Sequence, residues 1–411
     1  MDRSSSPPTR EALPRALRGF FLSAAFMDGG FFLIMVAMPF KVLDLGGGAL
    51  ELGLVPAIGA VVYIVSAPLA GHWSDRVSRT LLCLGGGAVL VAAALAAWRT
   101  GRLDVLLALQ GLMGLGKSLY WPAVQATLGD LSSGATRVGV LGRFNVAWSG
   151  GKTAGFLAGG LLLGALGFEA VYLGGAACVM VAFVLLPKGG RVDAALAVAG
   201  RGDATAAAAS APAPHHSTPP AAMLRAFRAM GWVANTAAYG AFGILTHHLP
   251  QWFAAQQWAP DRYGWYLGLI LASQTAVFLL LAGPLPLAWS ARRLWLPQVA
   301  SAAAVAIIPA AGFAGLLATA PVIGLGCGVC YAASIYYSLE GQEGRGRNAG
   351  IHEGLVGAGG LLPPLLAGLL VRWGAGLHAP YLLASALLLG AVGLQVILRI
   401  RIPGETSSTA S

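Results

Sequence analysis

The stretch GHWSDRVSRT, from Gly71 to Thr80, decides how this sequence folds. It stands between two apolar runs, near residues 49 to 71 and 80 to 98, and holds one aspartate and two arginines. Apolar runs of about 20 residues are long enough to cross a bilayer as helices. Arginines in a short connection hold that connection on the cytoplasmic side. The stretch is therefore predicted to be a tight cytoplasmic turn between two membrane helices.

The rest of the chain repeats this pattern of apolar runs and short polar connections. Of the 411 residues, 57% are hydrophobic and only 10% are charged, which is too apolar for a water-soluble protein of this length. Runs of membrane length lie near 18–40, 49–71, 80–98, 103–127, 138–165, 168–187, 229–254, 263–288, 294–313, 317–339, 348–372 and 376–399. We therefore expect an all-α membrane protein with 12 transmembrane helices.

The distribution of basic residues predicts the orientation of these helices. If both termini are cytoplasmic, the inside segments hold 19 of the 26 Lys and Arg residues and the outside segments hold five. This asymmetry follows the positive-inside rule and, with the Ala, Gly and Arg content of a GC-rich bacterial genome, predicts a multi-pass protein of the cell inner (cytoplasmic) membrane. The basic residues stand singly between apolar runs, so the net charge of +10 predicts no binding of nucleic acid.

A central break and an internal repeat divide the chain into two similar halves. Residues 188–225 are rich in Ala, Pro and small polar residues and predict a disordered cytoplasmic linker. Residues 1–187 then form one six-helix bundle, and residues 226–411 form a second bundle with a short tail. The stretch that begins with GLGKSLYW at Gly114 aligns without a gap with the one that begins with GLGCGVCY at Gly324. Parallel halves of this kind are typical of transporters that bind substrate between them.

The turn quoted first also resembles a family motif. Gly71, Asp75, Arg76 and Arg79 match G-x-x-x-D-R-x-x-R, which is similar to the signature loop of the major facilitator superfamily. The resemblance implies the fold of that superfamily, in which two six-helix bundles are related by a pseudo-two-fold axis. It further implies that Asp75 latches the two halves together in one conformation, against the start of the eleventh span and near Arg137.

The fifth predicted span carries a second, partial resemblance. Its sequence GGKTAGFLAGG is similar to the antiporter motif of the same superfamily, G-x-x-x-G-P-x-x-G-G, with Phe156 in place of the proline. The matching glycines are Gly151, Gly155, Gly159 and Gly160. The resemblance slightly favours export, although antiporters of the family have an arginine where this chain has Leu107. The alternative is a plain helix-packing seam, because glycines four residues apart let two helices approach closely.

Six ionisable side chains inside predicted spans are candidates for function, because charge is expensive in a membrane and therefore marks function by default. They are Asp28, Lys117, Lys152, Glu353, His247 and His352. A proton-coupled carrier needs a buried carboxyl group that binds and releases a proton, so Asp28 is the first candidate for coupling and Glu353 the second. The alternative for Asp28 and the two lysines is a structural ion pair. Glu353 could equally serve as a gate or a structural ion pair near the membrane surface.

Polar and aromatic side chains at helical spacing predict the lining of a central cavity. Lys117 shares a helix face with Trp121, and an ammonium group beside an indole suits an anionic or zwitterionic ligand. The expected cavity residues are Asp28, Lys117, Tyr120, Trp121, Asn145, Lys152, Tyr239, Tyr331 and Ser334. Such stripes line mixed polar and aromatic sites, although they also serve plain helix packing.

These observations predict a secondary active transporter rather than an enzyme. We expect proton-coupled, alternating-access movement of a small organic molecule by a monomer in the bilayer, with export slightly favoured. The alternative is an uptake symporter for an organic anion or zwitterion, and a remote one is a non-transporting membrane sensor or enzyme. No cofactor or metal is expected, because Cys327 and Cys330 form a CxxC inside an apolar run without a second ligand pair. His215 and His216 likewise lack the spacing of a metal site.

Overall fold

The computed structural model describes residues 12–74, 76–132, 134–189, 191–192, 195, 220–280, 289–340 and 345–400. Helices account for nearly all of this part of the chain. They are α1 (Ala12–Asp44), α2 (Ala49–Ser74), α3 (Arg79–Arg99), α4 (Leu103–Asp130), α5 (Gly134–Leu185), α7 (Ala221–Ala255), α8 (Pro260–Leu280), α9 (Ala291–Ile307), α10 (Phe313–Leu339), α11 (Arg345–Leu370) and α12 (Ala379–Ile400). A short turn of 3₁₀ helix, Ile308–Ala310, follows α9, and a π-helical segment, Val371–Ala375, follows α11.

Helix α5 contains two of the predicted spans. Gly167, with φ of 79°, breaks it into two arms, and this backbone conformation is open to glycine without strain. The break falls between the predicted spans 138–165 and 168–187. Nine described segments are long and apolar enough to cross a membrane, with both arms of α5 counted in one segment. Helices α4 and α7 fall outside that set and carry several of the polar candidate residues.

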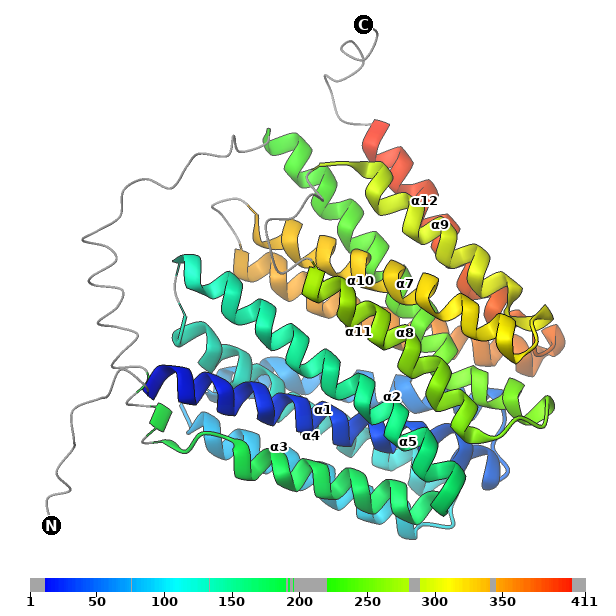
Figure 1. The fold of residues 1–411 in the computed structure, drawn as a ribbon, viewed down its shortest axis with the longest axis horizontal. Coiled ribbons are helices and arrows are strands. Elements are labelled where there is room, and N and C mark those ends of the chain that lie inside the picture. Colours follow the sequence, from blue (N-terminus) through cyan, green and yellow to red (C-terminus); the bar gives the residue numbers. More distant parts are fainter. Residues whose placement is uncertain are drawn as a thin grey trace, which may run out of the picture.

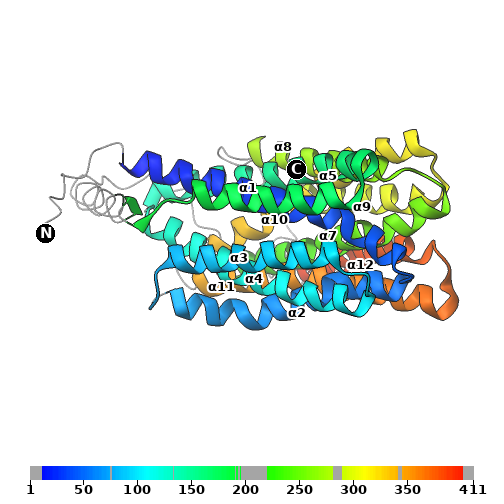
Figure 2. The same cartoon turned by 90° about the horizontal axis from the view of Figure 1, so that it is seen from below.

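Two bundles make up the described structure. Helices α1 to α5 form the N-terminal half, and helices α7 to α12 form the C-terminal half. The two bundles meet at one end and diverge at the other, so that the molecule has a wedge shape (Figure 1). Seen from below, the helices run roughly along the long axis of the molecule (Figure 2). We call the end with the α1–α2 and α7–α8 connections the closed end, and the opposite end, where α1 begins and α12 finishes, the open end.

Backbone contacts join the two halves at the closed end. A Cβ atom built on Gly160 of α5 would lie 2.6 Å from Gly264 Cα of α8, and one built on Gly53 of α2 would lie 2.7 Å from Pro364 O of α11. Real Cβ atoms do not approach other atoms this closely. Glycine is therefore required at these positions, because only without a side chain can helices of opposite halves come so near.

The open end lacks such contacts among the described glycines. Cβ atoms built on Gly71 of α2 or on Gly350 and Gly354 of α11 would meet nothing within 4 Å. At the closed end, by contrast, Gly53 of α2 and Gly368 of α11 are in backbone contact with the opposite half. At these three described positions of the open end, α2 and α11 are therefore not in the backbone contact that they make at the closed end.

The structure moves several predicted boundaries. Helix α7 begins at Ala221, so the last residues of the predicted linker 188–225 are helical, and most of the remainder lies outside the described residues. Helix α9 ends at Ile307 instead of continuing to 313, because Pro309 lies in the 3₁₀ turn that follows it. Hydropathy alone did not locate these two helix ends, because it does not measure where the backbone hydrogen bonds of a helix begin or stop.

Candidate functional site

A cluster of charged side chains lies in the N-terminal half where α1, α4 and α5 face the C-terminal half. Asp28 of α1 is 4% exposed, and the charged side chains that act on it electrostatically are Lys117 of α4 and Lys152 of α5. No Lys or Arg nitrogen of the described residues lies within 4.0 Å of an Asp28 oxygen, and Asp28 Oδ1 has no hydrogen-bond partner there. The structure therefore brings Asp28, Lys117 and Lys152 together, but the carboxylate forms no direct ion pair with either lysine.

The two ammonium groups lie over aromatic rings instead. Lys117 Nζ is 4.4 Å from the ring centre of Phe31 and 5.5 Å from that of Phe32. Lys152 Nζ is 4.5 Å from the ring centre of Phe32. A cation over an aromatic face gains about 0.5 to 2 kcal/mol, and more when both are shielded from water. Phe32 thus holds two ammonium groups close to one buried carboxyl group.

Lys152 also reaches the other half of the molecule. Its Nζ atom is 4.5 Å from the ring centre of Phe242 and 5.9 Å from that of Tyr239, both on α7. Lys152 itself is 5% exposed. One ammonium group is therefore held between a ring of α1 and a ring of α7, so that it bridges the two halves.

A hydrogen bond next to this bridge also crosses between the halves. Ser149 Oγ of α5 lies 2.7 Å from Thr275 Oγ1 of α8, and Ser149 is fully buried. Thr153, one turn further along α5, lies 3.4 Å from the same Thr275 oxygen. The contact between α5 and α8 therefore runs from the glycines of the closed end to the level of the charged cluster.

Aromatic rings form the wall of the site on the side of the open end. The ring centres of Trp148 and Tyr331 are 5.9 Å apart, and those of Tyr239 and Tyr331 are also 5.9 Å apart. Trp148 comes from the N-terminal half and the two tyrosines from the other. Asn145 Oδ1 accepts a hydrogen bond of 3.0 Å from Trp148 Nε1, which fixes the indole against the wall. Asn145 therefore orients an aromatic group.

Glu353 of α11 faces the same space from the C-terminal half. Its side chain is exposed, although its charge acts on Lys117 and Tyr63, which belong to the N-terminal half. Exposure together with these neighbours places the carboxyl group in the accessible space between the halves. The site thus has one buried carboxyl group on α1 and one accessible carboxyl group on α11.

The neighbouring histidine, His352, was a candidate from the sequence, but no partner was predicted for it. His352 is fully buried, its Nδ1 atom lies 2.8 Å from Ser334 Oγ, and its ring centre is 5.0 Å from that of Tyr331. The hydroxyl of Ser334, which was predicted to line the cavity, is thereby hydrogen-bonded to His352. The position of a histidine next to a glutamate gives no periodic signal, so sequence reasoning could not assign this contact.

Two predicted lining residues pack within the N-terminal half. Tyr120 is 1% exposed and its hydroxyl lies 2.8 Å from Ser23 Oγ of α1. Trp121 is 8% exposed and its ring contacts Phe144, with the centres 5.9 Å apart. Both side chains therefore serve the interior of the bundle in this conformation, whereas Lys117, on the preceding turn, reaches the cluster.

The signature turn lies at the open end. Arg79 Nη1 forms an ion pair of 2.5 Å with Asp130 Oδ2 at the end of α4, and Ser74 Oγ donates to Gly71 O. Asp130 was not among the predicted residues. Arg76 is exposed. The predicted latch partners Asp75 and the Arg137 side chain lie outside the described residues.

The glycines of the fifth span pack α5 directly against α1. Cβ atoms built on Gly151, Gly155 and Gly159 would lie 2.0, 2.4 and 3.0 Å from backbone carbonyl oxygens of α1. The first two oxygens belong to Ala25 and Gly29. Gly160 instead faces α8, as described above. Three glycines of the motif thus form a seam within one half, and the fourth joins the halves.

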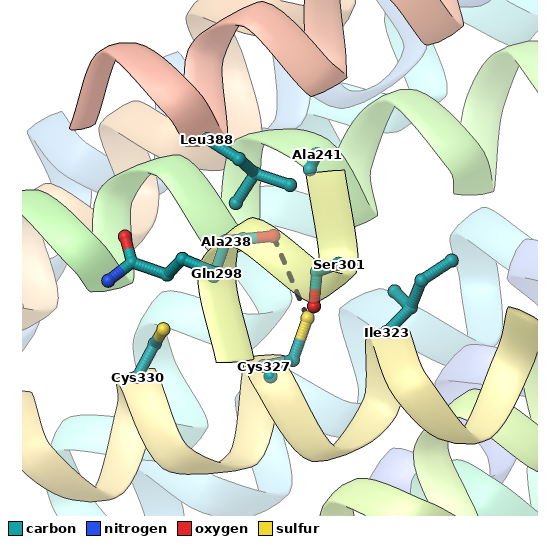
Figure 3. A pocket seen from close by; sticks show the side chains of 9 residues that line it. Ala238, Ala241, Gln298, Ser301, Ile323, Cys327, Cys330 and Leu388 are labelled. Atoms are coloured by element: carbon teal, nitrogen blue, oxygen red, sulfur yellow. Dashed lines mark hydrogen bonds between the residues drawn. The ribbon is translucent and has the colours of Figure 1, made fainter. Parts of the chain in front are cut away.

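The CxxC cysteines lie in the interior of the C-terminal half. Together with Gln298 and Ser301 of α9 they line a closed cavity of about 10 Å³, which is about the space of one water molecule (Figure 3). Cys327 Sγ donates to Ala238 O over 3.8 Å. No group of three potential metal ligands occurs among the described His, Cys, Asp and Glu side chains. The cysteines therefore act as packing residues against α7.

Comparison with known proteins was consistent with this architecture. A family model described as Major Facilitator Superfamily matches residues 20–257. Multidrug transporter protein MdtP of Bacillus subtilis (strain 168) is 25% identical over 169 residues, which are 41% of this chain. The match spans only 30% of the length of that curated relative.

Solved structures of transporters match nearly the whole chain. The human organic anion transporter MFSD10 (TETRAN) is 20% identical, with a TM-score of 0.58 over 95% of this chain and 100% of that chain. The nucleoside transporter NupG is 12% identical, with a TM-score of 0.67 over 94% of this chain and 99% of that chain. At these identities the likeness shows the fold, which is the all-helical, multi-span architecture that the sequence predicted.

Proposed function

Because the chain belongs to the major facilitator superfamily of secondary transporters, we propose that it carries a small organic molecule across a membrane by alternating access, driven by protons. A member of this family is a transporter and not an enzyme. The observation that carries the proposal is the buried Asp28 carboxyl group, which lies near two ammonium groups without an ion pair to either.

Asp28 and Glu353 divide the proton-coupling role in this proposal. Asp28 binds the coupling proton in this proposal. Among the described residues it has no direct ion-pair partner that would hold it in the charged form, and its protonation changes the net charge of the cluster. Glu353, whose side chain is exposed, exchanges protons with the solvent in this proposal. Protonation of Asp28 leaves the Lys117 and Lys152 charges uncompensated nearby, so proton binding alters the affinity of the site for substrate.

The open end is the cytoplasmic end in this proposal, in the inner membrane of a bacterium, and the structure is then inward-facing. The positive-inside distribution of Lys and Arg supports this orientation. Export is the favoured direction. It is supported by the similarity to a multidrug transporter over 169 residues and by the glycine pattern of α5, in which Gly151 and Gly155 match the antiporter motif.

The test uses purified protein in proteoliposomes with an imposed pH gradient and a panel of labelled organic compounds. Wild-type protein is expected to move at least one compound against its gradient. Asp28→Asn is expected to abolish transport driven by protons while exchange of substrate down its gradient persists. Asp104→Asn, which changes an exposed carboxyl group at the start of α4, is the control and retains activity. Proton-driven transport by the Asp28 variant would refute the assignment of coupling to this residue.

A second candidate function is supported by the two lysines. An uptake symporter for an organic anion would bind the anionic group between Lys117 and Lys152, with the surrounding rings against the apolar body of the substrate. One structural relative is a transporter of organic anions. Substitution of both lysines by glutamine separates the two candidates, because it removes anion transport in this case and leaves the transport of neutral or cationic compounds.

A further inference from the structure

A cleft at the closed end is separate from the charged cluster. It is a shallow surface cleft of about 370 Å³ that is open to the solvent. The N-terminal half contributes residues 48–51, at the start of α2, and the C-terminal half contributes Gln251, Val371 and Arg372. The two halves therefore form opposite walls of one solvent-facing site.

The floor of the cleft is closed by backbone contacts between α2 and α11. A Cβ atom built on Gly368 would lie 2.4 Å from Ala49 O, and one built on Gly53 would lie 2.7 Å from Pro364 O. These contacts leave no room for a side chain, and still less for a substrate. In this conformation a molecule in the cleft consequently does not reach Asp28 or the lysines.

Opposite charges stand on the two walls. Glu51 Oε2 accepts a hydrogen bond of 2.8 Å from Gly48 N, which fixes the carboxylate at the start of α2. Arg372 is exposed on the π-helical segment after α11. No carboxylate oxygen of the described residues, Glu51 included, lies within 4.0 Å of an Arg372 nitrogen. A carboxylate and a guanidinium group thus line the same cleft without neutralising each other directly.

We propose that this cleft binds a small zwitterion, whose ammonium group contacts Glu51 and whose carboxylate contacts Arg372. A simple cation would pair with one wall and be repelled by the other, and a simple anion would behave in the same way with the walls exchanged. A molecule with both charges satisfies both walls, and Gln251 supplies an amide that donates to or accepts from it. The site goes beyond the transport function proposed above, and its existence does not depend on that function.

Binding in the cleft is coupled to the conformation of the protein. Each charged wall belongs to a different half, so the walls separate when the closed end opens. A ligand that contacts both walls binds the closed end more tightly than the opened end, and so shifts the population towards the closed end. The zwitterion therefore acts as a regulator of the gate from the side opposite to the open end.

The experiment measures thermal unfolding of the detergent-solubilised full chain with glycine, β-alanine, 4-aminobutyrate and 6-aminohexanoate. This series varies the separation between the ammonium and carboxylate groups. Butyrate and butylamine, which carry one charge each, serve as ligand controls. At least one zwitterion is expected to raise the unfolding midpoint by about 2 °C or more, because a ligand bound only to the folded protein stabilises it by mass action.

Two variants and two matched controls test the location of the site. Glu51→Gln and Arg372→Gln are each expected to lose the shift. Glu169→Gln and Arg99→Gln, which remove exposed charges at the same end outside the cleft, are expected to retain it. The proposal is overturned if no zwitterion stabilises the wild type, if butyrate or butylamine does so equally, or if both cleft variants keep the shift. Transport activity enters none of these readouts.

Discussion

The ammonium group of Lys152 lies 4.5 Å from the ring centre of Phe242, across the boundary between the two halves. This contact has to break when the closed end opens, because the two residues belong to helices of different bundles. It is accompanied by the hydrogen bond between Ser149 and Thr275. Both contacts stabilise the conformation seen here, and they do so beside the charged cluster.

Replacement of Phe242 by leucine removes the aromatic face and keeps most of the apolar volume. We expect the closed end to lose about 1 kcal/mol of stabilisation, which is about a fivefold change in the ratio of the two conformations. Spin labels on Asp44→Cys and His378→Cys, both exposed at the closed end, report this ratio as a distance distribution. An unchanged distribution in the Phe242 variant would show that the cation–π contact does not hold the halves.

The contact between Gly160 and Gly264 predicts a sharp difference between two glycines of α5. Gly160→Ala places a methyl group 2.6 Å from a backbone atom of the other half, whereas Gly150→Ala meets nothing within 4 Å. The first variant is expected to favour the conformation with the closed end open, at a cost of about 1 to 3 kcal/mol to the closed one. The second is expected to resemble the wild type. The same spin-label distances compare them, and equal behaviour of the two variants would contradict the assignment.

The buried amide pair between α9 and α12 predicts a partial rescue. Gln298 and Gln395 are fully buried and exchange hydrogen bonds of 3.2 and 2.9 Å. Gln395→Leu leaves the amide of Gln298 without this partner and is expected to destabilise the protein by about 1 to 3 kcal/mol. The double leucine variant is expected to recover part of that loss, because no polar group then remains unpaired. Thermal unfolding midpoints of the three variants measure the effect, and a strictly additive loss would be inconsistent with the pair.

The ion pair of the signature turn is expected to contribute little to stability. The side chains of Arg79 and Asp130 are 26% and 52% exposed, and ion pairs this accessible to water contribute about 0 to 1 kcal/mol. Asp130→Asn should therefore shift the unfolding midpoint by no more than about 3 °C. A larger loss of thermal stability would assign the turn a structural role that its exposure does not support.

The sequence was sufficient for the fold because lipid imposes strong rules on composition. Apolar length placed the helices, and the break in α5 at Gly167 fell between two predicted spans. The start of α7 at Ala221 was missed, since helix propensity in an Ala-rich and Pro-rich stretch does not distinguish a linker from the first turns of a helix. Residue boundaries depend on hydrogen bonds that hydropathy does not measure.

The sequence singled out the charged residues of the candidate site but only some of its aromatic residues. Asp28, Lys117 and Lys152 could be selected because charge in a membrane helix is rare. Phe32 could not, because an aromatic residue in an apolar helix has the same pattern whether it packs against lipid or against an ammonium group. Contacts between helices that are far apart in the chain cannot be predicted from the periodicity of one helix.

The seam between α1 and α5 determines which parts of the site can change. Backbone touches backbone along Gly151 and Gly155, so these two helices have no side-chain layer on which to slide. In the alternating-access cycle proposed above, Asp28 on α1 and Lys152 on α5 would consequently keep a fixed separation, while Phe242 on α7 would move away and back. A bound molecule would thus face the same charged groups throughout the cycle, while the apolar surface on one side of it would be removed and restored.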